Sequence, residues 1–120
     1  MIDQGIEKGG NAMGITRENA QWWTTLIDWE HESDDETVRA VSIATTERWR
    51  QLEVKRGLHD PFVYLNDAAR DQNPLGSYGV ENVAKLKAVS RKYDPQQIFQ
   101  KLQNNGFLLS KSLAPPPSSI

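Results

Sequence analysis

The pattern of hydrophobic and polar positions along the chain predicts two strands joined by a helix. Residues 21–30, QWWTTLIDWE, alternate with a period of two and are rich in aromatic and β-branched side chains, which is typical of a β-strand. Residues 61–67, PFVYLND, alternate in the same way and are apolar on both faces, which predicts a second strand covered on two sides. Apolar residues between these runs recur at helical spacing. The order strand, helix, strand favours parallel pairing.

Local signals set the ends of two long helices. Ser33, followed three residues later by glutamate, forms a capping-box pattern and predicts that the first helix begins there. Gly57 suits the left-handed residue that commonly follows a helix, so we expect this helix to end near Arg56, with one apolar face buried. A second helix is expected to begin near Val80 and to break after Asp94, because a proline follows.

These elements predict a single α+β domain in which two long helices pack on one face of a small sheet. We expect an irregular lead-in over residues 1–19, the domain itself over residues 20–110, and a mobile tail rich in proline and serine over residues 111–120. The polar stretch between the second strand and the second helix predicts a loop, and the FLLS run near the end predicts a short strand or a docked segment. A short helical turn after Pro95 should place three apolar side chains inward, namely Ile98, Phe99 and Leu102. The expected core residues are Trp23, Ile27, Trp49, Leu52, Val63, Leu65, Leu86 and Val89.

Composition narrows the range of functions. The 120 residues correspond to one domain with a modest core. Because 14 Lys and Arg face 16 Asp and Glu, with a net charge of -2, the chain has no basic field, and we expect neither a nucleic acid nor a membrane as partner. The sequence shows no apolar run of the ~20 residues that span a bilayer and no signal-peptide pattern, so we expect a soluble chain and leave its localisation open.

The inventory of catalytic and metal-binding side chains is short. The chain contains no cysteine, and His31 and His59 are its two imidazoles. His31 lies in an acidic run whose spacing does not converge ligands on a cation, so we expect a solvated run at the start of a helix and no metal site. The sequence also lacks a phosphate-binding glycine loop and a nucleophile elbow.

Polar side chains gather where the second predicted strand ends. Tyr64 is placed to hydrogen-bond a substrate, Asn66 both donates and accepts, and Asp67 is suited to accept a proton. Tyr78 follows after the polar loop. A structural interpretation stays open beside this one, in which Tyr64 is an amphipathic core residue and Asp67 caps the following turn.

At these residues the chain resembles a known family. The stretch HDPFVYLNDAARDQNPLGSYGVENVAKLKAVSRKYDPQQIFQKLQNNGFLL is similar to the carboxyl-terminal berberine-bridge segment of fungal FAD-linked oxidoreductases, a branch of the vanillyl-alcohol-oxidase-like superfamily. The upstream run from Gly10 to Gly14 and the tryptophan-rich run resemble the part of the substrate domain that precedes this segment. The landmarks are the triplet Tyr64-Leu65-Asn66, the pair Tyr78-Gly79, the helix from Asn82 to Leu86, the break Lys92-Tyr93-Asp94-Pro95 and the pair Phe99-Gln100.

The resemblance implies an activity and a set of site residues. It implies FAD as cofactor and oxidation of a small organic molecule by hydride transfer, with electrons returned to oxygen, in fungal secondary metabolism. We expect Tyr64 and Asp67 to be catalytic and Asn66 and Tyr78 to bind the cofactor. Asp67 stands where berberine-bridge relatives often have a second tyrosine that serves as, or lies near, the catalytic base.

The flavin-binding domain of that family is absent from these residues. The leading hypothesis is therefore a substrate-domain module, a partial substrate lobe that is an enzyme only when a flavin-binding domain or another copy completes it. The lone chain is not expected to hold FAD stably. Two alternatives stay open. One is a non-catalytic remnant or interaction protein that keeps the fold of the lobe, and the other is a cofactor-free cyclase or isomerase that uses Tyr64 and Asp67 as acid and base.

Overall fold

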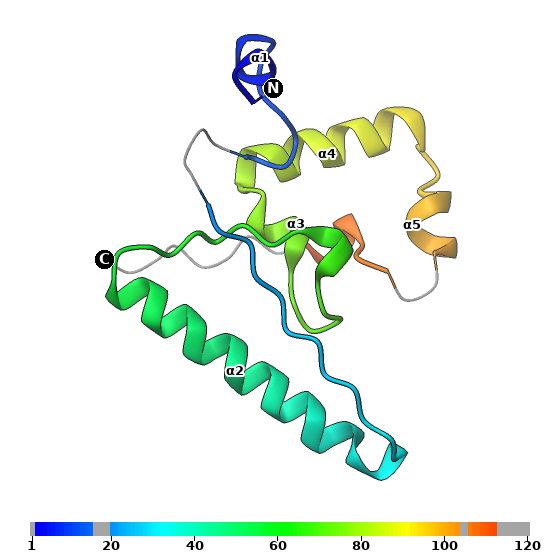
Figure 1. The fold of residues 1–120 in the computed structure, drawn as a ribbon. Coiled ribbons are helices and arrows are strands. Elements are labelled where there is room, and N and C mark those ends of the chain that lie inside the picture. The colour runs from blue at the N-terminus through cyan, green and yellow to red at the C-terminus, as the bar shows by residue number, and fades with distance from the viewer. Residues whose placement is uncertain (1, 16–19, 104–105, 113–120) are drawn as a thin grey trace. The chain divides into compact units, whose positions relative to one another are not determined.

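The computed structural model describes residues 2–15, 20–103 and 106–112, which form helices joined by extended segments (Figure 1). These residues divide into two compact units, one formed by residues 20–60 and one formed by the residues on either side of that range. The elements in chain order are the helix α1 (Ile2–Glu7), the 3-10 turn η1 (Glu32–Asp34), the helix α2 (Asp35–Lys55), the turn η2 (Leu65–Asp67), the helices α3 (Pro74–Ser77), α4 (Val80–Tyr93) and α5 (Ile98–Leu102), and the turn η3 (Leu109–Lys111).

The predicted α+β fold with a small sheet is wrong, because the described residues contain no β-strand. Residues 21–30 are extended, but they pair with no neighbouring strand. Residues 61–64 are also extended, and the chain then turns into η2 where the second strand was expected to continue. A period-two pattern describes a surface that fits a pleated sheet, and it becomes a strand only where another strand completes the backbone hydrogen bonds. The predicted parallel pairing is therefore wrong as well.

Helix α2 lies close to its predicted bounds. Its amino end follows η1, and Asp34 occupies the N-cap position. The predicted capping box does not form, because the Ser33 hydroxyl contacts the Asp34 carboxylate at 3.4 Å and caps no amide of the helix. At the other end Arg56 is the C-cap, and Gly57 follows with φ +66°, so the prediction that glycine ends this helix is confirmed.

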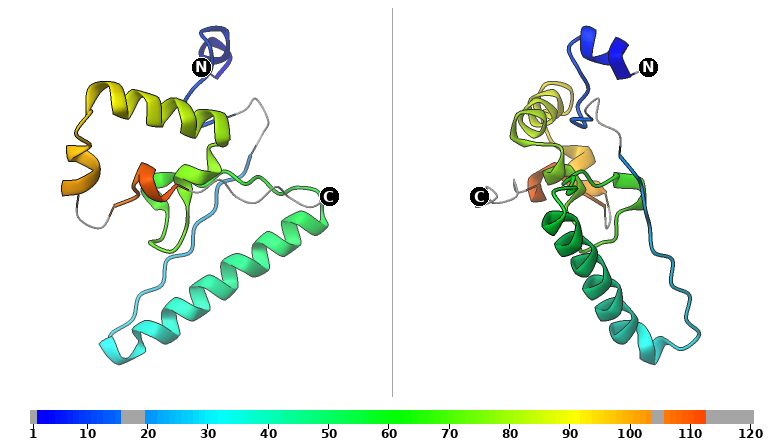
Figure 2. Two further views of the ribbon diagram at one scale, coloured as in Figure 1. Left: turned by 180° about the vertical axis from the view of Figure 1, so that it is seen from behind. Right: turned by 60° about the vertical axis from the view of Figure 1, so that its left-hand side comes forward.

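An extended segment, residues 20–31, runs alongside α2 within the same unit (Figures 1 and 2). Two indole N–H groups hold it there. Trp23 Nε1 donates to Glu53 Oε1 at 3.1 Å near the carboxyl end of the helix, and Trp29 Nε1 donates to Asp35 Oδ1 at 2.7 Å at its first residue. The segment is thus fastened to α2 at both ends by side chains.

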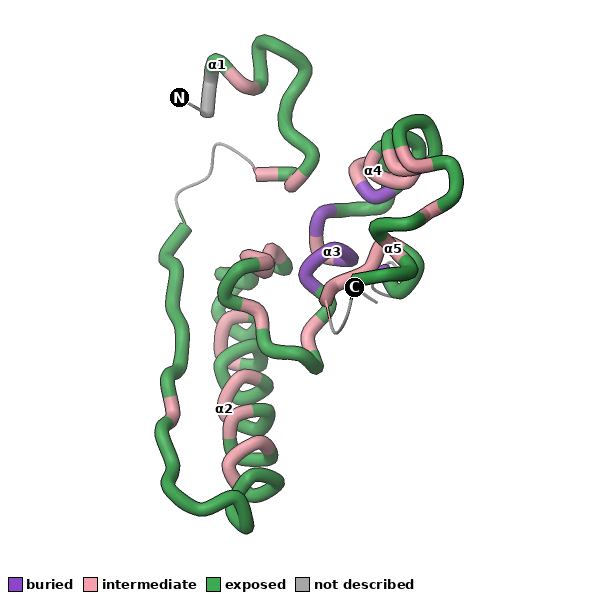
Figure 3. The backbone as a smooth tube through the Cα atoms, turned by 90° about the vertical axis from the view of Figure 1, so that its right-hand side faces the viewer, coloured by how far each residue is buried: buried purple, intermediate pink, exposed green. Residues whose placement is uncertain are grey.

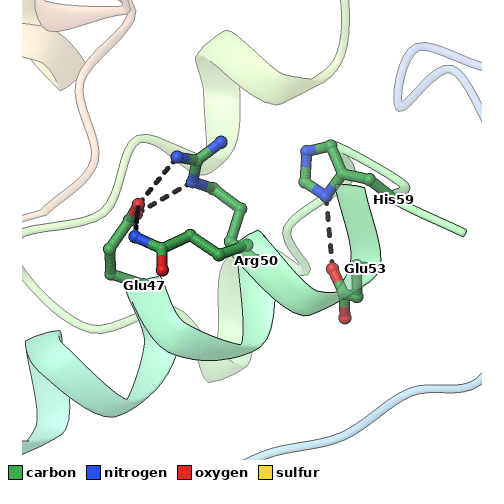
Figure 4. A network of polar contacts seen from close by, with 5 residues as sticks. Glu47, Arg50, Glu53 and His59 are labelled. Carbon is green, nitrogen blue, oxygen red and sulfur yellow. Dashed lines mark hydrogen bonds and ion pairs between the residues drawn. The ribbon is translucent and has the colours of Figure 1, made fainter. Parts of the chain in front are cut away.

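Charged and polar side chains form contacts along the carboxyl-terminal half of α2 and just beyond its end (Figure 4). Arg50 donates two hydrogen bonds to the Glu47 carboxylate, at 2.7 and 2.8 Å, and Gln51 donates a third at 3.1 Å. These hydrogen bonds, that of Arg50 above all, lower the pKa of Glu47 to about 2, so the pair stays ionised at ordinary pH. The next contact along the helix joins Glu53 Oε2 to His59 Nδ1 at 3.2 Å. Glu47 and Arg50 are exposed, so their pairing is expected to contribute little to stability.

The buried core is small and lies around α3 and α4 (Figure 3). The buried residues of the described ranges are Pro74, Leu75, Gly76, Tyr78, Val83 and Ser112. The predicted core was wrong. Three of its members are exposed, namely Trp23, Trp49 and Val89, and the other five are half-buried. Helix α2, whose apolar face was expected to be covered, has no buried residue at all.

Helix α4 begins at Val80, as predicted, and ends before the proline. Asp94 then helps the next helix, α5, to begin, because its carboxylate accepts hydrogen bonds from the backbone amides of Ile98 and Phe99, at 2.8 and 3.0 Å. The predicted break and short helical restart are confirmed. The inward orientation predicted for this turn is wrong, since its three apolar side chains are exposed, namely Ile98, Phe99 and Leu102.

The ends of the chain also differ from the expectation. The lead-in, expected to be irregular, contains α1. The FLLS run forms no strand and leads into η3, which lies against α4, where Lys87 Nζ donates to the Ser112 carbonyl at 3.4 Å. From residue 113 onward the predicted mobile tail lies outside the described residues. No helix in the described ranges is long and apolar enough to cross a lipid bilayer.

Candidate functional site

The predicted site residues lie on or beneath residues 62–67, here named the Tyr64 segment. The Val63 amide donates to Ser77 Oγ at 3.0 Å, which joins the segment to α3. The ring of Phe62 stacks on that of Tyr78, with centroids 5.7 Å apart and 17° between the planes. The backbone hydrogen bond to Ser77 and the stacked rings thus join the Tyr64 segment to α3 and Tyr78.

Helix α3 forms where the sequence pattern predicted a loop. Asn73 accepts a hydrogen bond from the Gly76 amide at 3.0 Å and so caps the helix, and Pro74 occupies its first position, where a missing N–H costs least. The Ser77 hydroxyl donates to the Pro74 carbonyl at 2.6 Å. This bond orients the Ser77 hydroxyl, which also accepts the hydrogen bond from the Val63 amide. The short helix therefore supports the Tyr64 segment.

Tyr64 and Asn66 are brought together at the surface. Asn66 Nδ2 donates to the Tyr64 hydroxyl oxygen at 3.0 Å. Tyr64 is half-buried and Asn66 is exposed, so the pair presents a polar edge. The amide oxygen of Asn66 accepts no hydrogen bond from the described residues and is available to a ligand donor.

Asp67 follows on the same turn and is exposed. Its amide donates to the Tyr64 carbonyl at 3.2 Å, which closes η2. Its carboxylate makes no hydrogen bond or ion pair with any described residue. The nearby Ala69 amide donates to the side chain of Gln72, at 2.8 Å, so the structure gives no support to Asp67 as the cap of this turn. Asp67 offers an unpaired proton acceptor next to the polar edge.

Tyr78 occupies a different position from the other three residues. Its side chain is only 7% exposed, beneath the Tyr64 segment. Burial raises the pKa of its hydroxyl, Tyr64 raises it further, and a backbone hydrogen bond with Leu65 lowers it in part. The hydroxyl therefore stays protonated and faces the segment. The cofactor-binding role of Tyr78 stays a prediction, and its position is that of a support.

Two further residues support the site. The sequence analysis gave them no role in it, although both lie in stretches that carry the family resemblance. Asn82 Nδ2 donates to the Tyr78 carbonyl at 2.9 Å. Gly14 has φ +73° and packs so tightly that a Cβ atom there would lie 2.8 Å from the same carbonyl oxygen and 3.1 Å from Asn82 Nδ2. Glycine in a glycine-rich stretch is a weak signal, because most such residues only permit a turn.

Gly14→Ala is expected to destabilise the unit that holds the site. The added methyl group meets a backbone carbonyl, and the left-handed backbone adds about 1–2 kcal/mol of strain. The matched control is Gly10→Ala, whose φ is +84° but whose Cβ would meet nothing within 4 Å, so it carries the strain alone. Urea unfolding of both variants measures the difference. Equal midpoints would show that the contact with Tyr78 does not matter.

Similar proteins are found among fungal flavoenzymes. An FAD-dependent monooxygenase of Arthrobotrys oligospora is 36% identical over 108 residues, which cover 90% of this chain and 21% of the relative. The bifunctional solanapyrone synthase of Alternaria solani is 35% identical over 109 residues, which cover 91% of this chain and 21% of the relative. An FAD-dependent monooxygenase of Fusarium proliferatum is 39% identical over 102 residues, which cover 83% of this chain and 20% of the relative. No family model matches the chain, and no solved structure matches it significantly.

The chain thus spans about a fifth of the length of the curated relatives it matches. These matches confirm the predicted resemblance to part of a fungal FAD-dependent enzyme. The berberine-bridge assignment and the superfamily stay predictions.

The polar edge is part of the surface and not of an enclosed pocket. A small-molecule ligand is normally buried on most of its surface, whereas Tyr64 is half-buried and Asn66 is exposed, so the described residues of this unit form no enclosure around the edge. Two surface hollows of this structure lie elsewhere, one on α2 and one between α4 and α5. No three His, Asp or Glu side chains of the described ranges gather as a metal site.

Proposed function

We propose that this chain is a substrate-domain segment of an FAD-linked oxidoreductase of the vanillyl-alcohol-oxidase-like superfamily, which oxidises a small organic molecule in fungal secondary metabolism. The observation that carries the proposal is the match of 83–91% of the chain to about a fifth of each relative. The exposed edge at Tyr64 and Asn66 supports it, because an incomplete pocket wall is what a segment of a larger enzyme would present.

The residues of this edge have distinct roles in the proposed reaction. Tyr64 and Asn66 orient the substrate against the flavin by hydrogen bonds from the hydroxyl and to the amide oxygen. The Asp67 carboxylate accepts the proton that the substrate loses as it is oxidised. FAD, when bound, supplies the acceptor for the hydride. Tyr78 holds the segment in place from beneath.

The apolar surface of the chain supports completion by another polypeptide portion. Large hydrophobic side chains are exposed along α2, α4 and α5, and they include Trp49, Val89 and Phe99. On α2, Val41 and Trp49 line one apolar groove, and an exposed apolar patch is typical of an interaction site.

A chimera tests the proposal directly. In the Arthrobotrys monooxygenase, the matched 108 residues are replaced by those of this chain, and FAD content is measured from the absorbance of the purified protein. We expect the chimera to retain stoichiometric FAD and the lone chain to retain none. Tight stoichiometric binding of FAD by the lone chain, or a folded chimera that holds no flavin, would contradict the proposal.

A non-catalytic interaction protein is the second candidate, and the exposed apolar faces favour it equally. The two candidates differ in what the chimera does. A chimera that is folded, flavin-free and inactive would favour the interaction protein, whereas retained flavin favours the enzyme segment.

A further inference from the structure

Helix α2 carries an apolar groove that the other residues of its own unit, 20–34 and 56–60, leave open. Its volume is about 480 Å³. The side chains on it are 53% exposed at Val41 and 48% exposed at Trp49, and no residue of the helix is buried. The lining residues are Val41, Ala44, Thr45, Arg48, Trp49 and Leu52.

The groove is preorganised for a partner. Trp49 packs against Trp23, with ring centroids 5.6 Å apart, and Trp23 is in turn held by its hydrogen bond to Glu53. A side chain that is already ordered loses little entropy on binding, and tryptophan is enriched among the residues that dominate interfaces. A helix of 21 residues also depends on packing of its apolar face for most of its stability.

The charge in the groove argues against a second copy of this chain as the occupant. Arg48 is the one charged residue of the lining, and it makes no ion pair with any described residue. In a parallel pair of α2 helices Arg48 would face its own copy. In an antiparallel pair centred on the groove, the two arginines would lie only about 5 Å apart along the axis. Either arrangement brings like charges together and supplies no carboxylate.

We propose that this groove binds an apolar surface with an acidic side chain facing Arg48, and that the surface belongs to the four fifths of the enzyme outside this chain. The inference rests on the proposed function. It adds to that function the place where the rest of the enzyme docks and the kind of side chains that the docking surface carries. The length of the relatives supports the choice, because they are about five times as long as the segment that matches this chain.

Two valines of α2 provide a matched test. Val41 lies in the groove and Val54 lies outside it, and their exposures are 53% and 51%. In the Arthrobotrys chimera, Val41→Gln should lower the melting temperature by at least about 2 °C, because it buries an amide against an apolar surface, whereas Val54→Gln should not. Arg48→Glu should lower it as well. In the lone chain, neither valine variant should change the helix content measured by circular dichroism.

The outcomes separate this inference from the proposed function. Flavin content reports on the function, and the melting temperatures report on the groove whether or not flavin is held. Equal melting temperatures for the two valine variants of the chimera would overturn the inference. So would a loss of helix in the lone Val41→Gln chain, which would show that the chain covers its own groove. Dimerisation of the lone chain, abolished by Val41→Gln in light scattering, would assign the groove to a second copy instead.

Discussion

Tyr78→Ala is expected to release the Tyr64 segment from α3 and to destabilise its unit by about 3 kcal/mol. Tyr78 is one of the few buried side chains among the residues that the structure describes, and it supplies the ring on which Phe62 stacks. Removing it leaves a cavity and removes both the stacking with Phe62 and the hydroxyl contact at Leu65, whereas the hydrogen bond from Val63 to Ser77 remains possible. With so small a core, a loss of this size is a large part of the stability of the unit.

Amide hydrogen exchange at Val63 measures the effect, because this amide is bonded to Ser77 Oγ only while the segment is docked. Tyr78→Phe is the control. It keeps the stacked ring and loses only the hydroxyl contact at Leu65, so we expect a cost of about 1 kcal/mol and a Val63 amide that stays protected. Equal protection of Val63 in the wild-type and alanine variants would show that the hydrogen bond to α3 is sufficient without the ring.

The two long helices, α2 and α4, were predictable because their signals are local. Gly57 and the Asp94-Pro95 pair mark the carboxyl ends of α2 and α4. Each acts through its own backbone conformation, which does not depend on distant residues. The prediction for the amino end of α2 was less precise. The Ser33 pattern predicted a capping box, but the short turn η1 places Asp34 at the cap position instead.

The sheet was not predictable from this sequence, because a strand is defined by its partner. Residues 21–30 have the composition of a strand, yet the described chain offers no strand to pair with, and tryptophan side chains fasten the segment to α2 instead. The same reasoning explains the failed core. The helical spacing that placed Trp49 and Leu52 on one face was correct, but spacing does not tell whether the covering surface belongs to the same chain.

The site was predictable in part. Tyr64, Asn66 and Asp67 are close in sequence and share a turn, so their proximity followed from the chain itself. The burial of Tyr78 depends on contacts with Phe62 and with the chain around Gly14, and no local pattern reveals such contacts. The polar loop before it also concealed α3, because Asn73-Pro74 is as typical of a helix start as of a turn.

Asp67→Asn is expected to lower turnover of the completed enzyme by about 100-fold or more while leaving its flavin content unchanged, because a carboxylate that accepts a proton in the reaction contributes a factor of this order. The measurement uses the solanapyrone synthase with its 109 matched residues replaced by this chain, and follows the formation of solanapyrone. Tyr64→Phe should lower turnover by about 10–100-fold through loss of a hydrogen bond to the substrate. Asp28→Asn, which changes an exposed aspartate of the extended segment before α2, is the control and should change little.

Melting temperature and turnover together distinguish a proton acceptor from a residue that only shapes the turn. If Asp67 accepts the proton, Asp67→Asn lowers turnover while the melting temperature and the flavin content of the chimera stay unchanged. A structural role would lower the melting temperature together with turnover. Turnover that is unchanged in Asp67→Asn would remove this residue from the mechanism, and the base would then have to come from the part of the enzyme outside this chain.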